Sequence, residues 1–331
     1  MTNTLLVLLD GAEDDPNPEL GGKKPLDVAK MPFIMGNMKT RGRTTGKDYT
    51  HLFLNELFTG HPPKLQRAVL EAMGFGMEVT PGRAAFRLSP AYIRDGMIEW
   101  AYNTEDFREK LQKSVTKHLP MLDHLNPQFR FFISSRAIIT IDCDEIPELP
   151  GPPKNTPYVE VPGDMGKMVR AVAEELDGLT DYPWGVGTCS EQYPHFEALD
   201  NLMAFSDSPT SLGICASLGY GFKVIDDLEE RFSAAEEALK HGNVFLHIDE
   251  IDEYSHMKKW KKKVDLLEEV DALMEKHFSD AERIFYFIDH GTSCVTGEHL
   301  PVTVPFWTTF ETDIEDDELV PVGQIINRLF R

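Results

Sequence analysis

The hydrophobic pattern of the chain contains three short apolar runs that each end in an acidic residue. They are Thr4–Asp10, Asn243–Asp249 and Arg283–Asp289. Continuous apolar runs with polar flanks are typical of strands buried on both faces of a parallel sheet. Because the carboxyl ends of parallel strands meet at one edge of a sheet, we expect the three acidic residues to share that edge.

Amphipathic helical patterns lie between these runs. They cover 165–176, 228–240 and 258–277. Strands that alternate with helices favour a doubly wound α/β sheet, in which ligands bind beyond the carboxyl ends of the strands. The basic run 258–263, at the start of the last helix, is interpreted as a solvated helix face.

The stretch from about residue 77 to 149 has a different pattern. Its predicted elements are a strand at 84–88, a hairpin at 94–97, a helix at 104–117 and strands at 129–133 and 137–141. This order is typical of a small α+β domain, and the Pro/Gly-rich segment 147–153 is a candidate linker. We therefore predict a discontinuous α/β core, residues 1–76 and 150–331, with an inserted α+β cap domain, residues 77–149.

The composition of the chain limits the kinds of partner that we expect it to bind. It has 33 Lys and Arg against 55 Asp and Glu among 331 residues, a formal charge of −22. Such a surface repels a phosphate backbone, so we expect no nucleic-acid partner. No apolar run approaches a membrane span, and the four cysteines form no C-x-x-C pair. A cytoplasmic protein with reduced thiols and no membrane partner is the expectation, with no preference for an oligomeric state.

Six acidic and histidine residues form a candidate ligand set for metals. They are Asp10, Asp252, His256, Asp289, His290 and His299. Three carboxylates and three imidazoles suit Mn²⁺ or Zn²⁺, and two such ions side by side can clamp the oxygens of an in-line phosphoryl displacement. A lone Asp at a strand end is more often a helix cap or turn residue, so these residues alone leave a metal site and coincidence about equally supported.

The same residues lie in blocks that resemble the archaeal-type, 2,3-bisphosphoglycerate-independent phosphoglycerate mutases of the alkaline phosphatase superfamily. The block from Asp10 to Pro32 resembles the opening of that family, which contains Asp-Gly and Pro-Glu-Leu-Gly-Gly-Lys-Thr-Pro-Leu. Asp252-Glu-Tyr-Ser-His256 is similar to its Asp-Glu-Ala-Gly-His, and Asp289-His-Gly-Thr-Ser-Cys294 to its Asp-His-Ser-Thr-Pro-Cys. The resemblance covers nearly the whole chain in order, and it implies an alkaline-phosphatase-like fold.

The resemblance also implies an activity and a division of the ligands. One divalent metal would be bound by Asp10, Asp289 and His290, and a second by Asp252, His256 and His299. The implied function is metal-dependent phosphotransfer, by a phosphomutase or a phosphohydrolase, on a small phosphorylated acid. In the family a metal-activated serine takes the phosphoryl group from a phosphoglycerate and returns it to the other hydroxyl. Arg136, which precedes a predicted cap strand, and His51 are the implied substrate-binding residues.

The chain departs from the family at the nucleophile. The family motif reads Gly-Ser-Asp, followed shortly by Ala-His-Leu, and the corresponding segment here is Thr44–Leu52. Aligning Gly46, Asp48 and His51 with the motif puts Lys47 where the serine belongs, and lysine has no hydroxyl. The short segment Lys223–Glu229 also replaces a stretch that carries a substrate-region lysine in the family.

Three interpretations of this departure stay open. In the first, Thr44, Thr45 or Thr50 serves as the nucleophile in place of Lys47. In the second, the site hydrolyses a phosphate ester by direct attack of metal-bound hydroxide. In the third, the protein keeps its metals but is catalytically silent and binds a metabolite or a protein partner in a regulatory role.

Overall fold

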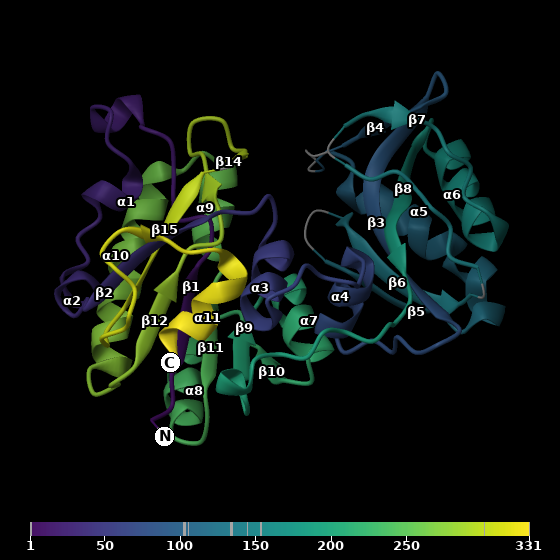
Figure 1. The fold of residues 1–331 in the computed structure, drawn as a ribbon. Helices are drawn as coiled ribbons and strands as arrows, with labels where there is room; N and C mark the ends of the chain where they lie inside the picture. The colour runs from purple at the N-terminus through teal and green to yellow at the C-terminus, as the bar shows by residue number, and fades with distance from the viewer. Residues whose placement is uncertain are drawn as a thin grey trace. The chain divides into compact units, whose positions relative to one another are not determined.

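The structure is a computed structural model that describes residues 2–101, 104, 106–132, 135–143, 145–152, 154–300 and 302–330. It divides into two compact units (Figure 1). Met1–Pro63 with Gln192–Arg331 is called the core unit, and Lys64–Glu191 the second unit. The core unit contains all six candidate metal ligands.

The core unit is built on an eight-stranded sheet with the order β10-β9-β11-β1-β12-β15-β2-β16 (Figure 1). Its strands are β1 (Leu5–Leu9), β2 (Thr40–Thr45), β9 (Met203–Ser206), β10 (Gly221–Val224), β11 (Val244–Ile248), β12 (Ile284–Phe287), β15 (Thr303–Thr308) and β16 (Glu318–Leu319). β1 pairs in parallel with β11 on one side and β12 on the other. All residues of these three strands are buried, which confirms the strands predicted from the three apolar runs.

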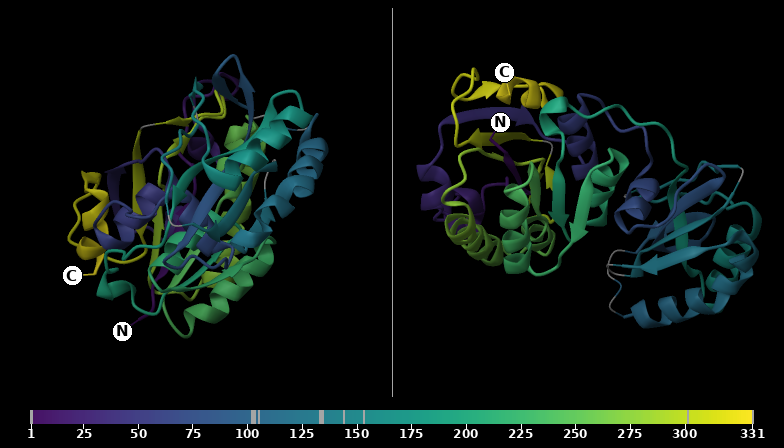
Figure 2. Two further views of the ribbon diagram at one scale, coloured as in Figure 1. Left: turned by 90° about the vertical axis from the view of Figure 1, so that its right-hand side faces the viewer. Right: turned by 90° about the horizontal axis from the view of Figure 1, so that it is seen from below.

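Helices cover both faces of this sheet (Figure 2). One set consists of α1 (Pro25–Val28), α2 (Pro32–Gly36), α8 (Leu228–Leu239) and α10 (Trp260–Phe278), with α10 contacting the other three. The other set consists of α3 (Thr50–Thr59), α7 (Pro209–Ser217) and α11 (Ile325–Leu329), with α3 contacting the other two. α7 leads outward from β9 to β10 and α8 leads back to β11, so right-handed crossovers place them on opposite faces. The predicted doubly wound α/β sheet is confirmed.

The second unit is an α+β structure around its own sheet. The strand order is β5-β6-β3-β4-β7, and β8 pairs with β3. The elements are α4 (Arg67–Gly74), β3 (Arg83–Arg94), β4 (Met97–Trp100), α5 (Arg108–His118), β5 (Gln128–Phe131), β6 (Ala137–Asp142), β7 (Thr156–Pro157), α6 (Gly163–Glu175) and β8 (Leu179–Gly187). The predicted strands and helix of this region correspond to β3, α5, β5 and β6, although Glu105 and Ile133 lie outside the described residues.

The units divide at 63/64 and 191/192, whereas the sequence predicts boundaries at 76/77 and 149/150. The difference arises because β8 pairs antiparallel with β3, and both α4 and α6 pack on β8. The segment 147–153, of which Pro153 is not described, leads on to β7, which pairs with β4 in the same unit. A Pro/Gly-rich stretch marks a turn or loop, and this one lies inside a unit.

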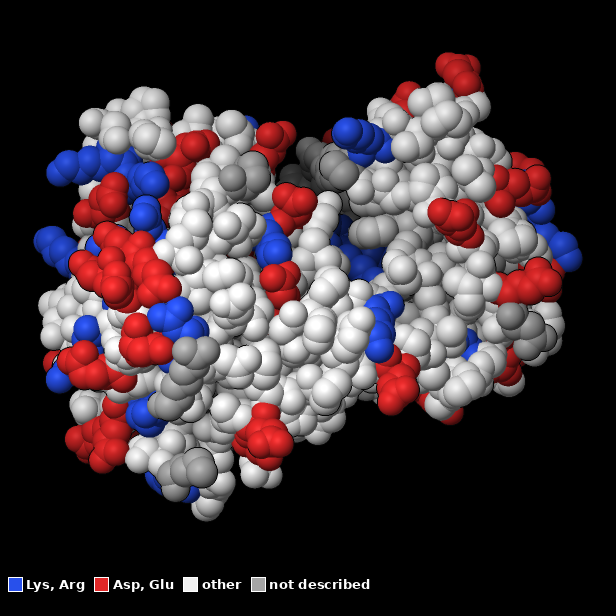
Figure 3. All heavy atoms as spheres, in the orientation of Figure 1, with Lys and Arg blue, Asp and Glu red and all other residues white. Residues whose placement is uncertain are grey.

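The surface of the core unit is strongly acidic in places. Figure 3 shows acidic side chains gathered in clusters on its visible face, with lysines and arginines between them. Asp10 and Asp289, by contrast, are 1% and 0% exposed. Among the described residues, no helix combines the length and the apolar character that crossing a membrane requires.

Candidate metal centre

The candidate ligands follow three neighbouring strands of the core sheet. Asp10 comes directly after β1, Asp289 and His290 come just after β12, and Asp252 lies on α9 (Glu250–His256), which follows β11. Because β1 lies between β11 and β12 in parallel register, these side chains meet at the carboxyl edge of the sheet.

Asp10, Asp289 and His290 form a buried group. His290 Nε2 lies 3.3 Å from Asp10 Oδ1 and 3.2 Å from Asp289 Oδ2, and each of the three residues offers a ligand atom within 4.8 Å of the others. Asp10 Oδ1 and Asp289 Oδ2 are buried without a hydrogen-bond partner, and in the described structure no Lys or Arg forms an ion pair with either residue. Buried carboxylates that lack compensation in this way fit a bound cation.

Asp252, His256 and His299 form a second, more exposed group. His256 Nε2 lies 3.1 Å from Asp252 Oδ2 and 3.2 Å from His299 Nε2, and His299 Nε2 lies 3.9 Å from Asp252 Oδ1. Each imidazole places its Nδ1 against a backbone carbonyl, His256 at 2.8 Å from Gly297 O and His299 at 2.6 Å from Asp48 O. A carbonyl only accepts, so each Nδ1 carries a proton, and each Nε2 faces Asp252, where it binds a metal once it has given up its own proton.

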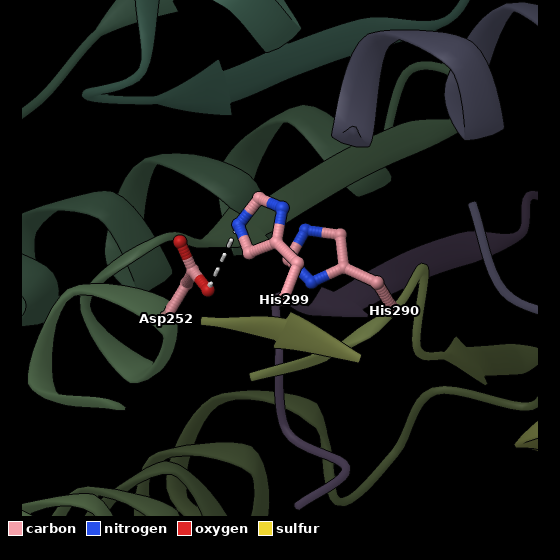
Figure 4. Close-up of side chains that lie close together, drawn as sticks. All are labelled: Asp252, His290 and His299. Carbon is pink, nitrogen blue, oxygen red and sulfur yellow. Dashed lines mark ion pairs between the residues drawn. The ribbon is translucent and has the colours of Figure 1, made fainter. Parts of the chain in front are cut away.

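The two groups adjoin one another. Figure 4 shows His299, the first residue of β14 (His299–Leu300), between Asp252 and His290. The rings of His290 and His299 are 4.1 Å apart between centroids, and Asp252, His290 and His299 also offer ligand atoms within 4.8 Å of one another. The six candidate ligands therefore lie in one continuous cluster.

A comparison with known families supplies the context for this cluster. Residues 2–319 match the family model of the Metalloenzyme superfamily. The chain belongs to this superfamily. Among its relatives, the 2,3-bisphosphoglycerate-independent phosphoglycerate mutase of Picrophilus torridus is 24% identical over 92% of this chain and 88% of the mutase. A mutase of the same description from Methanothermobacter thermautotrophicus is also 24% identical, over 92% of this chain and 88% of its own length.

Two solved structures have a similar fold. A protein from Pyrococcus horikoshii is similar over 99% of this chain and 96% of its own, with a TM-score of 0.74 and 17% identity. The cofactor-independent phosphoglycerate mutase of Thermoplasma acidophilum is similar over 99% of both chains, with a TM-score of 0.58 and 18% identity. The predicted fold is therefore confirmed, and the chain is a divergent member of the superfamily.

The electrostatics of this superfamily member favour a divalent cation at the cluster. Burial, and then the charges of Asp289 and Asp252, raise the pKa of Asp10 well above its ordinary value. For Asp252 burial acts in the same direction, but hydrogen bonds from His256 and His299 outweigh it and lower the pKa. A bound cation would hold Asp10 in its charged form, which the protein alone disfavours.

This arrangement predicts an unusual pH dependence for the metal-free protein. Because the folded state holds the Asp10 proton more tightly than the unfolded chain, this group's stabilisation is complete below the ordinary pKa of 3.8 and is lost as pH rises through the raised value. Metal-free wild type should therefore lose stability relative to Asp10→Asn as pH rises from about 4 to 8. Urea unfolding of both proteins measures the difference. A gap that grows in favour of wild type with rising pH contradicts the prediction.

His247 is a residue of the centre that the sequence reasoning missed. It lies on β11, is fully buried, and places Nε2 2.7 Å from Asp10 Oδ2 and Nδ1 2.8 Å from Ser206 Oγ. Burial, and then the charge of Arg231, lower its pKa to about 3, so the ring is neutral and orients Asp10 by hydrogen bonding. Asp249 lies 3.6 Å from the same Nε2. The available signal was a polar residue in the middle of an otherwise apolar buried strand.

Of the predicted nucleophiles, Thr50 lies against the cluster. It is the first residue of α3, and its Oγ1 is 3.3 Å from Asp10 Oδ2 and 3.4 Å from His290 Nε2. Thr45 is exposed on β2, where it is in register with Thr303 of β15. The geometry therefore favours Thr50 over Thr45.

Lys47 and His51 make other contacts. The Lys47 ammonium forms an ion pair with Glu56 at 2.7 Å, while the Lys47 backbone N donates to Asp289 O at 2.9 Å. Lys47 thus supports the ligand loop through its backbone, and its side chain is turned to a carboxylate of α3. The His51 ring is a neighbour of Tyr49, with 5.7 Å between the ring centroids.

Arg136 lies in the second unit, close to the buried Arg87. Burial, and then the charges of Arg67 and Arg136, lower the pKa of Arg87. Arg67 and Arg87 both form ion pairs with Glu71. A buried carboxylate thus joins Arg67 and Arg87 close to Arg136, and guanidinium groups are the side chains that bind carboxylates and phosphates through paired hydrogen bonds.

Proposed function

We propose that this chain is a metal-dependent phosphotransfer enzyme, a phosphomutase or a phosphohydrolase that acts on a small phosphorylated acid. The observation that carries the proposal is the Thr50 hydroxyl beside the buried group of Asp10, Asp289 and His290. Membership of the Metalloenzyme superfamily supports it, as does similarity to proteins that are named phosphoglycerate mutases.

Two divalent ions, Mn²⁺ or Zn²⁺, are part of the proposal. Asp10, Asp289 and His290 would hold one, and Asp252, His256 and His299 the other. When bound, such ions neutralise phosphoryl charge and lower the pKa of a neighbouring hydroxyl. The orphaned oxygens of Asp10 and Asp289 and the fixed Nε2 atoms of His256 and His299 support this division.

Thr50 is the proposed nucleophile. Its Oγ1 attacks phosphorus, the new O–P bond forms as the ester bond breaks, and the hydroxyl proton ends on the leaving alcohol. A phosphomutase then returns the phosphoryl group to a different hydroxyl of the same acid, whereas a phosphohydrolase passes it to water. Thr50 begins the ten-residue helix α3, whose dipole favours an anion at that end.

Arg136 and His51 are the proposed substrate-binding residues. The guanidinium group of Arg136 suits the carboxylate of a phosphorylated acid, because arginine binds such planar anions through two parallel hydrogen bonds. His51 follows the proposed nucleophile in α3 and would contact the phosphoryl end. A cytoplasmic location, expected from the composition, belongs to the same proposal.

The deciding experiment is an assay of purified protein that has been stripped with a chelator and reloaded with Mn²⁺ or Zn²⁺. We expect interconversion of 2- and 3-phosphoglycerate, hydrolysis of p-nitrophenyl phosphate, or both, and loss of the activity on renewed chelation. If reloaded protein binds the ions but does neither reaction, the catalytically silent alternative replaces this proposal. If it binds no ions, the metal centre itself is wrong.

A further inference from the structure

One lysine of the basic run at the start of α10 is fully buried. The sequence interpretation of this run as a solvated face is correct for Lys261 and Lys262, which are exposed, but it is wrong for Lys263, whose side chain is 0% exposed. A buried ammonium group is costly unless paired and hydrogen-bonded, so its surroundings must compensate the charge.

Four oxygens surround the Lys263 ammonium group. They are Gly11 O at 2.9 Å, Glu13 O at 3.3 Å, Thr292 O at 3.1 Å and Asp14 Oδ2 at 2.9 Å. The Asp14 side chain is itself 0% exposed. Lys263 therefore sits in an oxygen cage that resembles the shell of a bound cation.

The four oxygens belong to the two loops that follow the candidate ligands Asp10 and His290. Gly11 follows the ligand Asp10, and Thr292 follows the ligand His290 by two residues. The loops also meet directly, because Thr292 N donates to Glu13 O at 2.9 Å and Cys294 N donates to Asp14 Oδ1 at 3.0 Å. Lys263 thus ties together two loops whose residues are far apart in the chain.

The two loops pack so closely that there is no room for a side chain at Gly11. Gly11 has a positive φ of 59°, and a Cβ on it would lie 2.5 Å from Asp252 Oδ1 and 2.7 Å from Thr292 Oγ1. Thr292 Oγ1 in turn donates to Asp252 Oδ1 and lies 3.1 Å from His290 Nδ1. A shift of either loop would therefore displace ligands of both groups.

We propose that Lys263 is a positioning residue of the metal centre, whose buried ammonium group holds the Gly11–Asp14 and Gly291–Cys294 loops at the spacing that the metal ligands require. It reaches the metals only through these loops. The inference rests on the metal centre proposed above. It explains why a charge is buried here, because an apolar side chain could fill the volume but could not bind three carbonyl oxygens of two different loops.

The test compares the Mn²⁺ affinities of purified variants by calorimetry, at a temperature where circular dichroism shows each to be folded. Lys263→Met removes the charge and keeps the apolar stem, and Lys262→Met makes the same change at an exposed position of the same helix. Met274→Ala, buried in α10 and farther along the helix, controls for lost stability alone. We expect Lys263→Met to bind Mn²⁺ about 10- to 100-fold more weakly and the two controls to bind like wild type.

The outcomes separate this inference from the proposed function. If wild type binds no divalent ion, the metal centre fails. If wild type binds and Lys263→Met binds equally well, or if Met274→Ala weakens binding as much, only the positioning role fails. Should Lys263→Met not fold, Asp14→Asn carries the test, because it keeps the lysine and removes the charge that orients it. An unchanged affinity in that variant would overturn the inference, and a roughly tenfold loss would support it.

Discussion

Replacing Asp289 by asparagine is expected to remove one of two bound metal ions and to lower activity by about 10³-fold or more. Asparagine keeps the shape of the side chain but not its charge, and the Asp289 oxygen that lacks a partner is one that a cation would compensate. Metal content per chain after dialysis, measured by mass spectrometry, should fall from two ions to one. Activity is measured at saturating Mn²⁺.

A matched control is Asp265→Asn, an exposed carboxylate on α10. It makes the same chemical change outside the centre and should leave metal content and activity as in wild type. Two bound ions in Asp289→Asn would show that the assignment of Asp10, Asp289 and His290 to one centre is wrong. Loss of both ions would instead indicate that the two centres fill together.

Replacing Thr50 by valine is expected to lower activity by roughly 10³-fold, while metal binding is retained. Valine has the size of threonine and lacks the hydroxyl that lies 3.3 Å from Asp10 Oδ2. Thr50→Ser keeps a hydroxyl at this position and should retain most of the activity. Steady-state rates and Mn²⁺ affinity are measured for both variants side by side.

Thr45→Val serves as the control for this substitution, because Thr45 is an exposed threonine of β2 in the same segment. It should behave like wild type. If Thr50→Val remains fully active, Thr50 is not the nucleophile, and direct attack by water becomes the better description. A loss of activity that comes with a loss of metal would instead make Thr50 part of the metal-binding shell.

The core sheet was predictable because its central strands are apolar along their whole length. β1, β11 and β12 are buried on both faces, so their burial appears in the sequence as continuous runs. The boundaries of the two units were harder to predict from the sequence. β8 pairs with β3, which lies far from it along the chain, so that Leu179 is in register with Tyr92. Antiparallel pairing between such distant segments leaves no local signal in either sequence.

The candidate site shows the same limit at the level of side chains. Acidic residues at the ends of buried strands point to the centre, and their chain order carries the family resemblance. Lys263 and His247 were not recognisable, because a buried lysine or histidine differs from an exposed one only through partners elsewhere in the chain. The role of Lys47 was equally hidden, since its ion pair with Glu56 depends on how α3 turns after the loop.

The central position of β1 in the sheet has a consequence for folding during synthesis on the ribosome. Leu5 pairs with Val244 and Ile284, so β1 has neither of its neighbours in the sheet until synthesis has reached Val244. At ordinary translation rates this is a wait of roughly ten to fifty seconds. The second unit is one continuous stretch, Lys64–Glu191, and can complete its sheet during that time. Until then the apolar strand β1 lacks the strands that bury it, and exposed apolar segments of this kind are bound by chaperones during synthesis.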